Sequence, residues 1–433
     1  MSGQIKTNGA RATTRRVLTA SLAGTTIEFY DFYIYATAAS LVFGPLFFPA
    51  SSPSAQLLSA YASFGLAFVA RPMGSVIFGH FGDRIGRKST LVASLLIMGL
   101  STLAIAFLPT YETVGWLAPL ALCLLRIGQG IGLGGEWGGA VLLAVENAPP
   151  GYRARFGMTP QFGAPLGFIL ANGAFLLIGL FLTPEQFLAW GWRLPFLASA
   201  ALVAVGLWVR LQIHETPDFA AAIAKAPPPR VPLGELFREH AGVTIGGVFT
   251  GVISFAIFYI ATAFALGYAT TTLGIARTPF LTVQLGAILF LAIGIYTSGV
   301  LSDRFSAGRV ILAGCLGTVA VGFLMGPMMR GDSLFTTWLF LSMALFLMGI
   351  VYGPLGALLS DLFPARVRYT GASVAFNTAG ILGGAVTPLA AQALAERGGL
   401  TDVGLYLSAA ALVSFLGLVI LRRKSAFNGI STP

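Results

Sequence analysis

Apolar positions along the chain form long runs that short polar breaks separate. Most runs approach or exceed the roughly 20 residues that a helix needs to cross the hydrocarbon core of a bilayer. The runs are continuous, which favours helices over the alternating strands of about 10 residues that build membrane barrels. The pattern therefore predicts an all-α membrane protein with twelve spans, at about residues 17–43, 57–81, 89–109, 116–145, 158–182, 192–213, 241–270, 280–301, 310–329, 335–360, 371–394 and 404–421.

The composition is also that of an integral membrane protein. The 433 residues are 56% hydrophobic and only 10% charged, and the mean hydropathy is +0.82. A soluble protein of this length would need a more polar surface. Residues 1–16 are polar and basic, and the run after them is too long for the core of a signal peptide, so we expect no cleaved leader. Both cysteines, Cys123 and Cys315, fall inside apolar runs, which indicates neither a disulfide framework nor a metal cluster.

The net charge of +10 is explained by where the basic residues lie. Lys and Arg gather before the first span, in every second loop and after the last span, whereas the other loops hold Arg193, Arg277, Arg330 and Arg397. Positive residues favour the cytoplasmic side. We therefore expect a multi-pass protein of the plasma (bacterial inner) membrane with both termini cytoplasmic and no role in binding nucleic acid.

The longest polar break, residues 214–240, contains a run of three prolines that cannot continue a helix. We interpret it as a cytoplasmic linker between two six-helix halves, 17–213 and 241–421, with tails at 1–16 and 422–433. The halves repeat two short patterns in the same order. Gly79, Asp83 and Arg84 match Gly299, Asp303 and Arg304, and Glu146, Pro149 and Arg153 match Asp361, Pro364 and Arg368. Such parallel repeats are a transporter architecture.

Several motifs resemble those of the major facilitator superfamily. The loop "GHFGDRIGRKSTL" at 79–91 is similar to its loop signature, and "LCLLRIGQGIGLGG" at 122–135 to its fourth-helix signature. "IEFYDFYIYATAA", "GGEWGGAVLLAVE" and "WGWRLPF" resemble the metabolite:proton symporter branch, which includes permeases for shikimate, dicarboxylates, tricarboxylates, and proline or betaine. The resemblance implies alternating access in a monomer.

The loop signature also implies a cytoplasmic gate. Its glycines allow a tight turn, Asp83 is expected near a helix N-terminus of the other half, and Arg84 or Arg87 can pair with Glu146. The alternative is that the loop only anchors the topology. In the second copy, "DRFSAGR", the following Gly-Arg comes two residues late. The gate residues that we assign are Asp83, Arg84, Gly86, Arg87, Glu146, Arg153, Asp303, Arg304, Asp361 and Arg368.

Ionisable residues inside spans provide the candidate chemistry. Such a group costs roughly 2.5–3.5 kcal/mol at the centre of a lone helix, so these side chains should face one another or a wet cavity. All of them belong to the first half: Glu28, Asp31, Arg71, Arg126 and Glu136.

Glu28 and Asp31 lie three residues apart, on one face of the first helix. Two close carboxylates disfavour joint ionisation, so one of them can take up and release a proton. Arg126 cannot deprotonate but can hold a carboxylate bidentately. We therefore predict that a proton enters on Asp31 or Glu28 with Glu136 in support, that Arg126 leaves its acid partner, and that a substrate carboxylate replaces it. The alternative is a structural set of ion pairs.

Other positions complete the predicted site. Gln129 belongs with Arg126 to the fourth-helix signature and is assigned to the substrate. Arg71 either binds substrate or braces Glu28 or Asp31, and Arg193 is either an interfacial anchor or an entry site for anions. The spans of the second half carry no charge and should contribute neutral polar contacts or ordinary packing, with the candidates Tyr259, Gln284, Tyr296 and Asn377.

The resulting prediction is proton-coupled uptake of a small organic carboxylate, such as shikimate or a di- or tricarboxylate, with the proton as coupling ion and no cofactor or metal. Symport of a zwitterionic solute such as betaine or proline is the first alternative, and a drug/proton antiporter, which "QFGAPLGF" faintly resembles, is the second. An enzyme is not expected, because no nucleophile–base pair stands out. "GIGLGG" at 130–135 lies inside an apolar run and suits close helix packing rather than a dinucleotide.

Overall fold

The computed structural model describes residues 2–49, 52–85, 87–212, 233–364 and 367–427; within these ranges, the side chains of 2–17, 79–91, 209–212, 233 and 423–427 are not described. The elements before residue 213 are α1 (Ser2–Ala38), η1 (Ala39–Phe43), α2 (Gly44–Phe47), α3 (Pro53–Ile85), α4 (Arg87–Ile105), α5 (Tyr111–Val114), α6 (Leu117–Leu133), α7 (Glu136–Glu146), α8 (Arg153–Gly157), η2 (Pro160–Phe162), α9 (Gly163–Phe181), α10 (Pro184–Ala189), η3 (Gly191–Arg193) and α11 (Leu194–Gln212).

The second part of the chain repeats this sequence of long helices. Its elements are α13 (Leu233–Glu239), α14 (Ala241–Tyr259), η4 (Ile260–Phe264), α15 (Ala265–Thr271), α16 (Arg277–Phe305), α17 (Ala307–Gly322), α18 (Met325–Met328), α19 (Leu334–Tyr352), α20 (Leu355–Asp361), α21 (Arg368–Gly380), η5 (Ile381–Ala385) and α22 (Val386–Phe427). Helix α13 occupies the end of the predicted linker, and the rest of that linker lies almost wholly outside the described residues.

These elements form the predicted all-α, twelve-span fold. In the described chain, eight helical stretches are long and apolar enough to cross a membrane, and two shorter apolar helices cover 92–105 and 307–322. One of the eight, Arg368–Arg422, contains two spans that meet at Gly399, whose φ of 71° is the left-handed conformation that glycine accepts without strain. Helix α1 with η1 supplies the remaining span.

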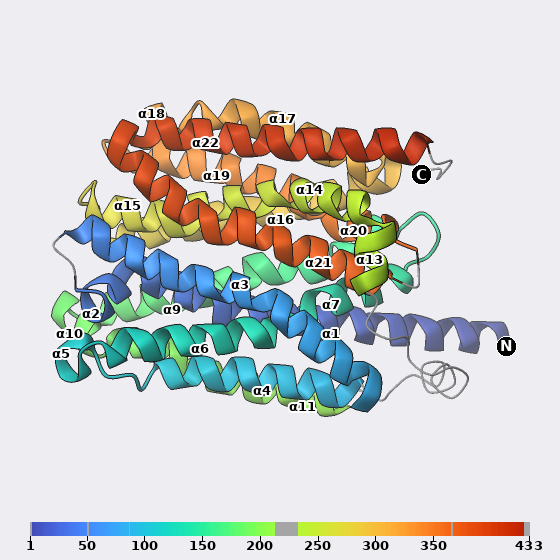
Figure 1. Ribbon diagram of the computed structural model, residues 1–433, viewed down its shortest axis with the longest axis horizontal. Helices are drawn as coiled ribbons and strands as arrows, with labels where there is room; N and C mark the ends of the chain where they lie inside the picture. The colour runs from blue at the N-terminus through green and yellow to red at the C-terminus, as the bar shows by residue number, and fades with distance from the viewer. Residues whose placement is uncertain (1, 50–51, 86, 213–232, 365–366, 428–433) are drawn as a thin grey trace.

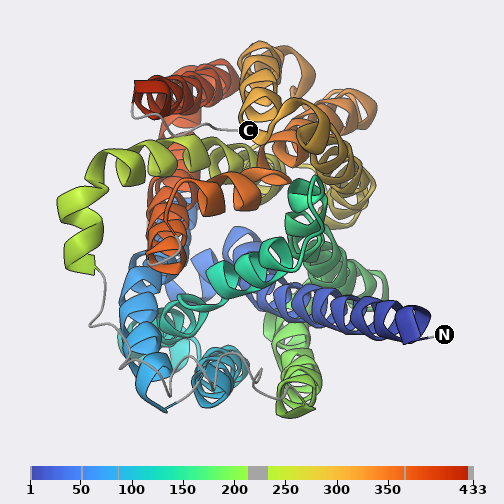
Figure 2. The same ribbon diagram turned by 90° about the vertical axis from the view of Figure 1, so that its right-hand side faces the viewer.

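The two halves lie side by side, with the first half below and the second half above in Figure 1. The start of α1 and the end of α22 lie at the same end, as an even number of spans requires; Figure 2 views the molecule from that end. Following the predicted topology, we call this the inner end and the opposite one the outer end. Contacts between the halves join α9 to α16, α3 to α21 and η5, and α7 to α20 and α21. Among the eight long apolar stretches, Ala241–Thr271 is the most enclosed, with 89% of its most apolar segment buried inside the protein.

Glycines bring α3 and α6 into direct contact, as the glycine-rich stretch predicts. A Cβ added to Gly134 would collide with the backbone carbonyl of Arg71, and one added to Gly130 would collide with that of Ala67. The prediction of close packing at "GIGLGG" is confirmed. Because of this contact, the helix that carries Arg71 lies against the helix that carries Arg126.

Three spans contain a π-turn, at η1, η4 and η5. The first two occupy equivalent places in the first span of each half. A π-turn interrupts the regular ladder of helical hydrogen bonds and is often found at functional sites. Hydropathy gives no signal for these turns, and the sequence analysis did not predict them.

Candidate functional site

The ionisable residues predicted inside the spans are all buried, on α1, α3, α6 and α7. The exposed fractions are 3% for Glu28, 1% for Asp31, 4% for Arg71, 0% for Arg126 and 7% for Glu136. None of them faces the lipid, and the predicted clustering of these side chains within the protein interior agrees with the cost of leaving them in hydrocarbon.

Arg126 is enclosed by aromatic rings and neutral polar groups. Its Nη1 donates to Gln129 Oε1 at 2.8 Å and its Nε donates to the Phe64 carbonyl at 3.3 Å. The guanidinium carbon lies 4.0 Å from the centre of the Tyr35 ring and 4.3 Å from that of Phe32, within the range of cation–π attraction. Nη2 is buried and makes no hydrogen bond. No carboxylate of the described residues lies within 4.0 Å of this guanidinium.

The direct acid partner expected for Arg126 is therefore replaced by a chain of neutral groups. Gln129 Nε2 donates to Thr102 Oγ1 at 2.7 Å, and the Thr102 hydroxyl lies 3.3 Å from Asp31 Oδ2. Thr102 is fully buried on α4 and is a residue that the sequence analysis missed. A threonine in an apolar helix gives no signal by itself, because its hydroxyl can bond the carbonyl of its own preceding turn.

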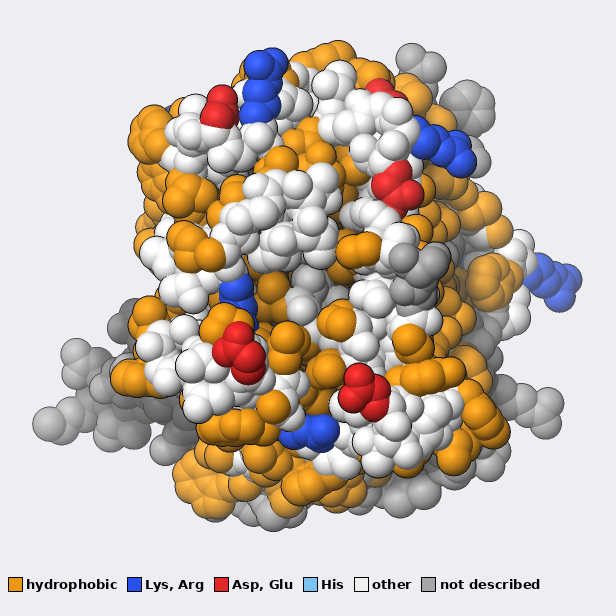
Figure 3. All heavy atoms as spheres, turned by 90° about the vertical axis from the view of Figure 1, so that its left-hand side faces the viewer, with side chains coloured by type: hydrophobic (Ala, Val, Ile, Leu, Met, Phe, Trp, Pro, Cys, Tyr) orange, Lys and Arg blue, Asp and Glu red, His pale blue; other side chains and the backbone are white. Residues whose placement is uncertain are grey.

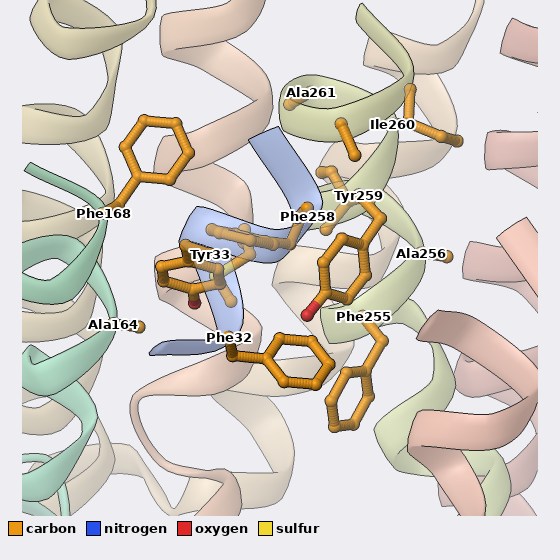
Figure 4. Close-up of a cluster of buried hydrophobic side chains, with 14 of the residues drawn as sticks. Phe32, Tyr33, Ala164, Phe168, Phe255, Ala256, Phe258, Tyr259, Ile260 and Ala261 are labelled. Atoms are coloured by element: carbon orange, nitrogen blue, oxygen red, sulfur yellow. The ribbon is translucent and has the colours of Figure 1, made fainter. Parts of the chain in front are cut away.

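The guanidinium groups of Arg71 and Arg126 both lie against the ring of Phe32. The Arg71 guanidinium carbon lies 4.6 Å from the Phe32 ring centre and 5.0 Å from that of Phe68. Tyr259 of the second half packs edge-on against Phe68 at 5.6 Å between ring centres, and Figure 4 shows its ring beside Phe32 and Phe255. Both arginines thus lie in a cage of aromatic faces at the interface of the halves.

The other two acids occupy the inner side of this cage. The Ser94 hydroxyl lies 3.4 Å from Glu136 Oε1. Glu28 lies near Tyr33 of the same helix and near Tyr352, which comes from α19. The Tyr352 side chain is 2% exposed and its hydroxyl makes no hydrogen bond. Polar groups of both halves therefore meet around Glu28.

The neutral candidates of the second half take different positions. Tyr259 lines the aromatic cage, but Asn377 donates to Ser75 Oγ at 2.9 Å and to the Gly134 carbonyl at 3.2 Å. Asn377 therefore bonds the break between α6 and α7 in the other half. Gln284 donates to two carbonyls of η4, and Tyr296 is 60% exposed on the outside of α16. The exposure of Tyr296 removes it from the candidate site.

Ion pairs join the halves at the inner end. Arg153 of α8 meets Asp361 of α20 at 2.7 Å, and Arg368 Nη1 of α21 lies 3.6 Å from Glu146 Oε1 of α7. Asp303 Oδ2 of α16 lies 3.1 Å from Arg155 Nε, and its Oδ1 accepts the backbone N–H of Ala154 at 2.9 Å. These contacts include half of the predicted gate residues, and Asp303 is paired with Arg155, which the sequence analysis had not assigned.

The remaining gate predictions are placed as follows. Arg304 is exposed, and its guanidinium lies over the adjacent ring of Phe305. The side chains of Asp83, Arg84 and Arg87, and the whole of Gly86, lie outside the described residues, so their predicted contacts stay predictions. In the described chain Glu146 pairs with Arg368.

Comparison with known proteins agrees with the membrane-transporter fold. The family described as "Sugar (and other) transporter" matches residues 16–227. The Escherichia coli (strain K12) inner membrane metabolite transport protein YhjE is 48% identical over 410 residues, which cover 94% of this chain and 93% of that protein. The xylose transporter XylE from E. coli, in a partially occluded inward open conformation, has a TM-score of 0.73 at 15% identity, covering 95% of this chain and 97% of that one.

The chain belongs to the family of metabolite transport proteins that includes YhjE, and it has the fold of the major facilitator superfamily. The shikimate transporter of Escherichia coli (strain K12) is 38% identical, with 94% of each chain covered. A glycine betaine/proline/ectoine/pipecolic acid transporter of Dickeya dadantii is 30% identical and covers 93% of this chain and 82% of that protein. The predicted family and fold are confirmed.

At the outer end of this transporter, the two equivalent π-turns meet across the interface. Ser40 of η1 and Tyr61 of α3 both donate to the Ala263 carbonyl of η4, at 3.0 and 2.8 Å. Gln284 of α16 donates to the carbonyls of Ala261 and Thr262 at 3.1 and 2.9 Å. Figure 3 shows this end of the molecule, where charged side chains are sparse among apolar and neutral ones.

The basic residues of this end also have defined contacts. Arg193 Nη1 donates to the carbonyls of Ala106 and Leu108, just beyond the end of α4, at 2.6 and 2.8 Å, which supports its interpretation as an anchor. The Arg277 guanidinium lies 3.5 Å from the ring centre of Phe187 of the first half.

Among the described residues, one group has metal-like spacing. Ligand atoms of Glu235, Glu239 and His240, at and after α13, lie within 4.8 Å of one another. These side chains are exposed or partly exposed at the inner surface, and nothing ties them to the central cage.

Proposed function

We propose that this transporter couples the uptake of a small organic carboxylate to the entry of protons, by alternating access between the two halves. The observation that supports this proposal most directly is the environment of Arg126. Its side chain is fully buried, no carboxylate of the described chain lies within 4.0 Å of it, and one of its nitrogens makes no hydrogen bond. A buried cation without a counter-charge is costly, so the site favours an anion. A carboxylate matches the planar guanidinium fork.

Asp31 is the acid that we assign to the proton. It is 1% exposed, its Oδ1 makes no hydrogen bond, and it is connected to Arg126 only through neutral groups. When a substrate carboxylate binds near Arg126, protonation of Asp31 offsets the added negative charge, so the net charge of the interior stays as it was before binding. Glu28 and Glu136 are assigned supporting roles, since both lie in the same enclosed region.

Substrate identity is tested by counterflow in proteoliposomes with shikimate, 2-oxoglutarate, citrate, benzoate and glycine betaine. We expect carboxylates to accelerate exchange and Arg126→Lys to reduce it by roughly tenfold or more, because lysine cannot reproduce bidentate binding. Acceleration by betaine alone would favour the zwitterion alternative, which draws on the same acids and arginines and on the Dickeya dadantii relative. Acceleration by lipophilic cations alone would favour an antiporter and contradict the proposal.

Proton coupling is tested with Asp31→Asn. We expect the variant to keep counterflow but to lose accumulation driven by a pH gradient, because the carboxamide cannot exchange a proton. Asp332→Asn, an exposed aspartate at the outer end, is the matched control and should behave as wild type. Unchanged accumulation in both Asp31→Asn and Glu136→Gln would show the proton assignment to be wrong.

A further inference from the structure

Thr102 has one hydroxyl hydrogen and two acceptors for it. The hydroxyl lies 2.9 Å from the carbonyl of Met98, one turn earlier on α4, and 3.3 Å from Asp31 Oδ2. It also accepts a hydrogen bond from Gln129 Nε2 at 2.7 Å. Thr102 and Gln129 are 0% and 1% exposed, so water does not reach these groups in this conformation.

The direction of each bond in this chain is fixed by Arg126. A guanidinium can only donate, so the amide oxygen of Gln129 must face Arg126 and its NH₂ must face Thr102. The Thr102 oxygen is therefore an acceptor on the Gln129 side, and its single hydrogen goes either to Asp31 or to Met98. An ionised Asp31 only accepts, so it draws this hydrogen; a protonated Asp31 can donate to a remaining lone pair on the Thr102 oxygen.

On the basis of the proposed function, we propose that Thr102 and Gln129 are positioning residues that transmit the protonation state of Asp31 to Arg126. With Asp31 ionised, every bond of the chain points from Arg126 towards the carboxylate, and polarisation along aligned hydrogen bonds partly compensates the buried positive charge. When a proton adds to Oδ2, Asp31 donates to Thr102 and Thr102 turns its hydrogen to Met98. The compensation then ends, and Arg126 gains affinity for a substrate carboxylate.

Asp31 also has other polar neighbours on the surrounding helices. Glu136 of α7 acts on it electrostatically, Tyr30 precedes it on α1, and Ser199 of α11 lies near its carboxylate without a hydrogen bond. The hydrogen-bonded chain through Thr102 and Gln129 connects Asp31 to the arginine, at Nη1. The bond to Asp31, at 3.3 Å, is the longest of the three and is the one that should break first.

The test compares Thr102→Val, Thr102→Ser and Thr318→Val in proteoliposomes. Thr318 is the matched control: it is fully buried on α17, in the corresponding span of the second half, and its hydroxyl bonds the Gly314 carbonyl at 2.8 Å, much as Thr102 bonds Met98. The readout is the half-saturation concentration for counterflow of the carboxylate that the wild type exchanges, measured across a range of pH.

In wild type we expect this half-saturation concentration to rise with pH as Asp31 loses its proton. A hydrogen bond to a charged group corresponds to roughly a tenfold change in an equilibrium, so Thr102→Val should flatten the rise by about that factor, while Thr102→Ser restores it and Thr318→Val leaves it unchanged. Gln129→Met breaks the chain at another link and should flatten the profile in the same way, which keeps the test valid if Thr102→Val fails to fold.

A wild-type pH profile in either Thr102→Val or Gln129→Met would overturn the relay. Failure of the relay is distinguishable from failure of the proposed function. If only the relay is wrong, Asp31→Asn still abolishes accumulation driven by a pH gradient while Thr102→Val keeps the wild-type profile. If the proposed function is wrong, Asp31→Asn has no effect or no carboxylate exchanges at all.

Discussion

Ion pairs join the halves at the inner end, whereas neutral hydrogen bonds join them at the outer end. The inner contacts are Arg153–Asp361, Arg155–Asp303 and Arg368–Glu146, with most of these side chains partly exposed. The outer contacts between the halves are the buried hydroxyls of Ser40 and Tyr61 in the first half, which both donate to the Ala263 carbonyl of η4 in the second half. An exposed ion pair contributes about 0–1 kcal/mol and a typical hydrogen bond about 0.5–1.5 kcal/mol.

We call the contacts that hold the two halves together at one end the closure of that end. The comparison shows how two chemically different closures can be similar in strength. Groups released at the inner end are charged and well hydrated once they separate, so opening costs little. Groups released at the outer end are the hydroxyls of Ser40 and Tyr61 and the Ala263 carbonyl of a π-turn, which water can satisfy once the end opens. If each closure is worth only a few kcal/mol, either end can open, as alternating access requires.

The largest effect is expected at Asp303, which is the most enclosed of the three ion-paired carboxylates described at the inner end, with 7% of its side chain exposed. Asp303→Ala removes the contact with Arg155 and leaves the Ala154 N–H without its acceptor. Losing a hydrogen bond to a charged group costs about 1.5–3 kcal/mol, so the inner end should open roughly tenfold more often.

The measurement is the rate at which an impermeant maleimide reacts with Ala357→Cys, a buried position of α20, after Cys123 and Cys315 are replaced. Asp303→Asn is the matched control, because its amide oxygen still accepts from Ala154 while the charge is lost. A smaller increase for the amide than for alanine is expected. Equal labelling rates in the wild type and in Asp303→Ala would show that Asp303 does not help to keep the inner end closed.

At the outer end, Gln284→Leu should have the next largest effect. It leaves two buried carbonyls, those of Ala261 and Thr262, without their side-chain donor, at a cost of about 1–3 kcal/mol. Gln284 and η4 both belong to the second half, so the loss acts indirectly: η4 no longer holds the Ala263 carbonyl in place for Ser40 and Tyr61 of the first half. The outer end should then open more often, seen as faster labelling of Leu266→Cys from outside. Tyr61→Phe is milder, because Ser40 still donates to the same Ala263 carbonyl. Faster labelling of the inner reporter instead would reverse the assignment of the ends.

Much of this architecture could be predicted from hydropathy. Spans two to eight and span ten begin and end within about five residues of their predicted positions, because the length of an apolar run is set by the bilayer, whereas the helix of the ninth span ends at Gly322 rather than near 329. The first helix starts earlier than predicted, at Ser2, and the break between the last two spans rests on Gly399. A basic polar segment can be helical without being apolar, which is why hydropathy missed the start of α1.

The sequence was enough to predict which charged residues are buried in the site, but not which groups they contact. The burial of Asp31 and Arg126 follows from their charge, since lipid excludes them. Their indirect link follows from the side-chain geometry of Thr102 and Gln129, which no local pattern encodes. Likewise, Arg368 and Glu146 form an ion pair across the halves, and only the packing of α7 against α21 brings them together. Arg155 escaped notice because the repeat pattern passes through Arg153 instead.

The smallest effect is expected for the exposed pair Arg153–Asp361, whose side chains are 41% and 40% exposed. Asp361→Arg places two like charges together and should open the inner end by a factor of about 2–5, within the 0–1 kcal/mol range of surface pairs. The exchanged double variant, Arg153→Asp with Asp361→Arg, should return the labelling of Ala357→Cys towards wild type. Raising the ionic strength should shrink both changes, because the Debye length falls from about 10 Å at 0.1 M to about 3 Å at 1 M. The same salt should leave the outer reporter unaffected, since the hydrogen bonds at that end join neutral groups and Arg277 there contacts the uncharged ring of Phe187. A salt effect of equal size at both ends would mean that the contacts at the two ends do not differ in this way.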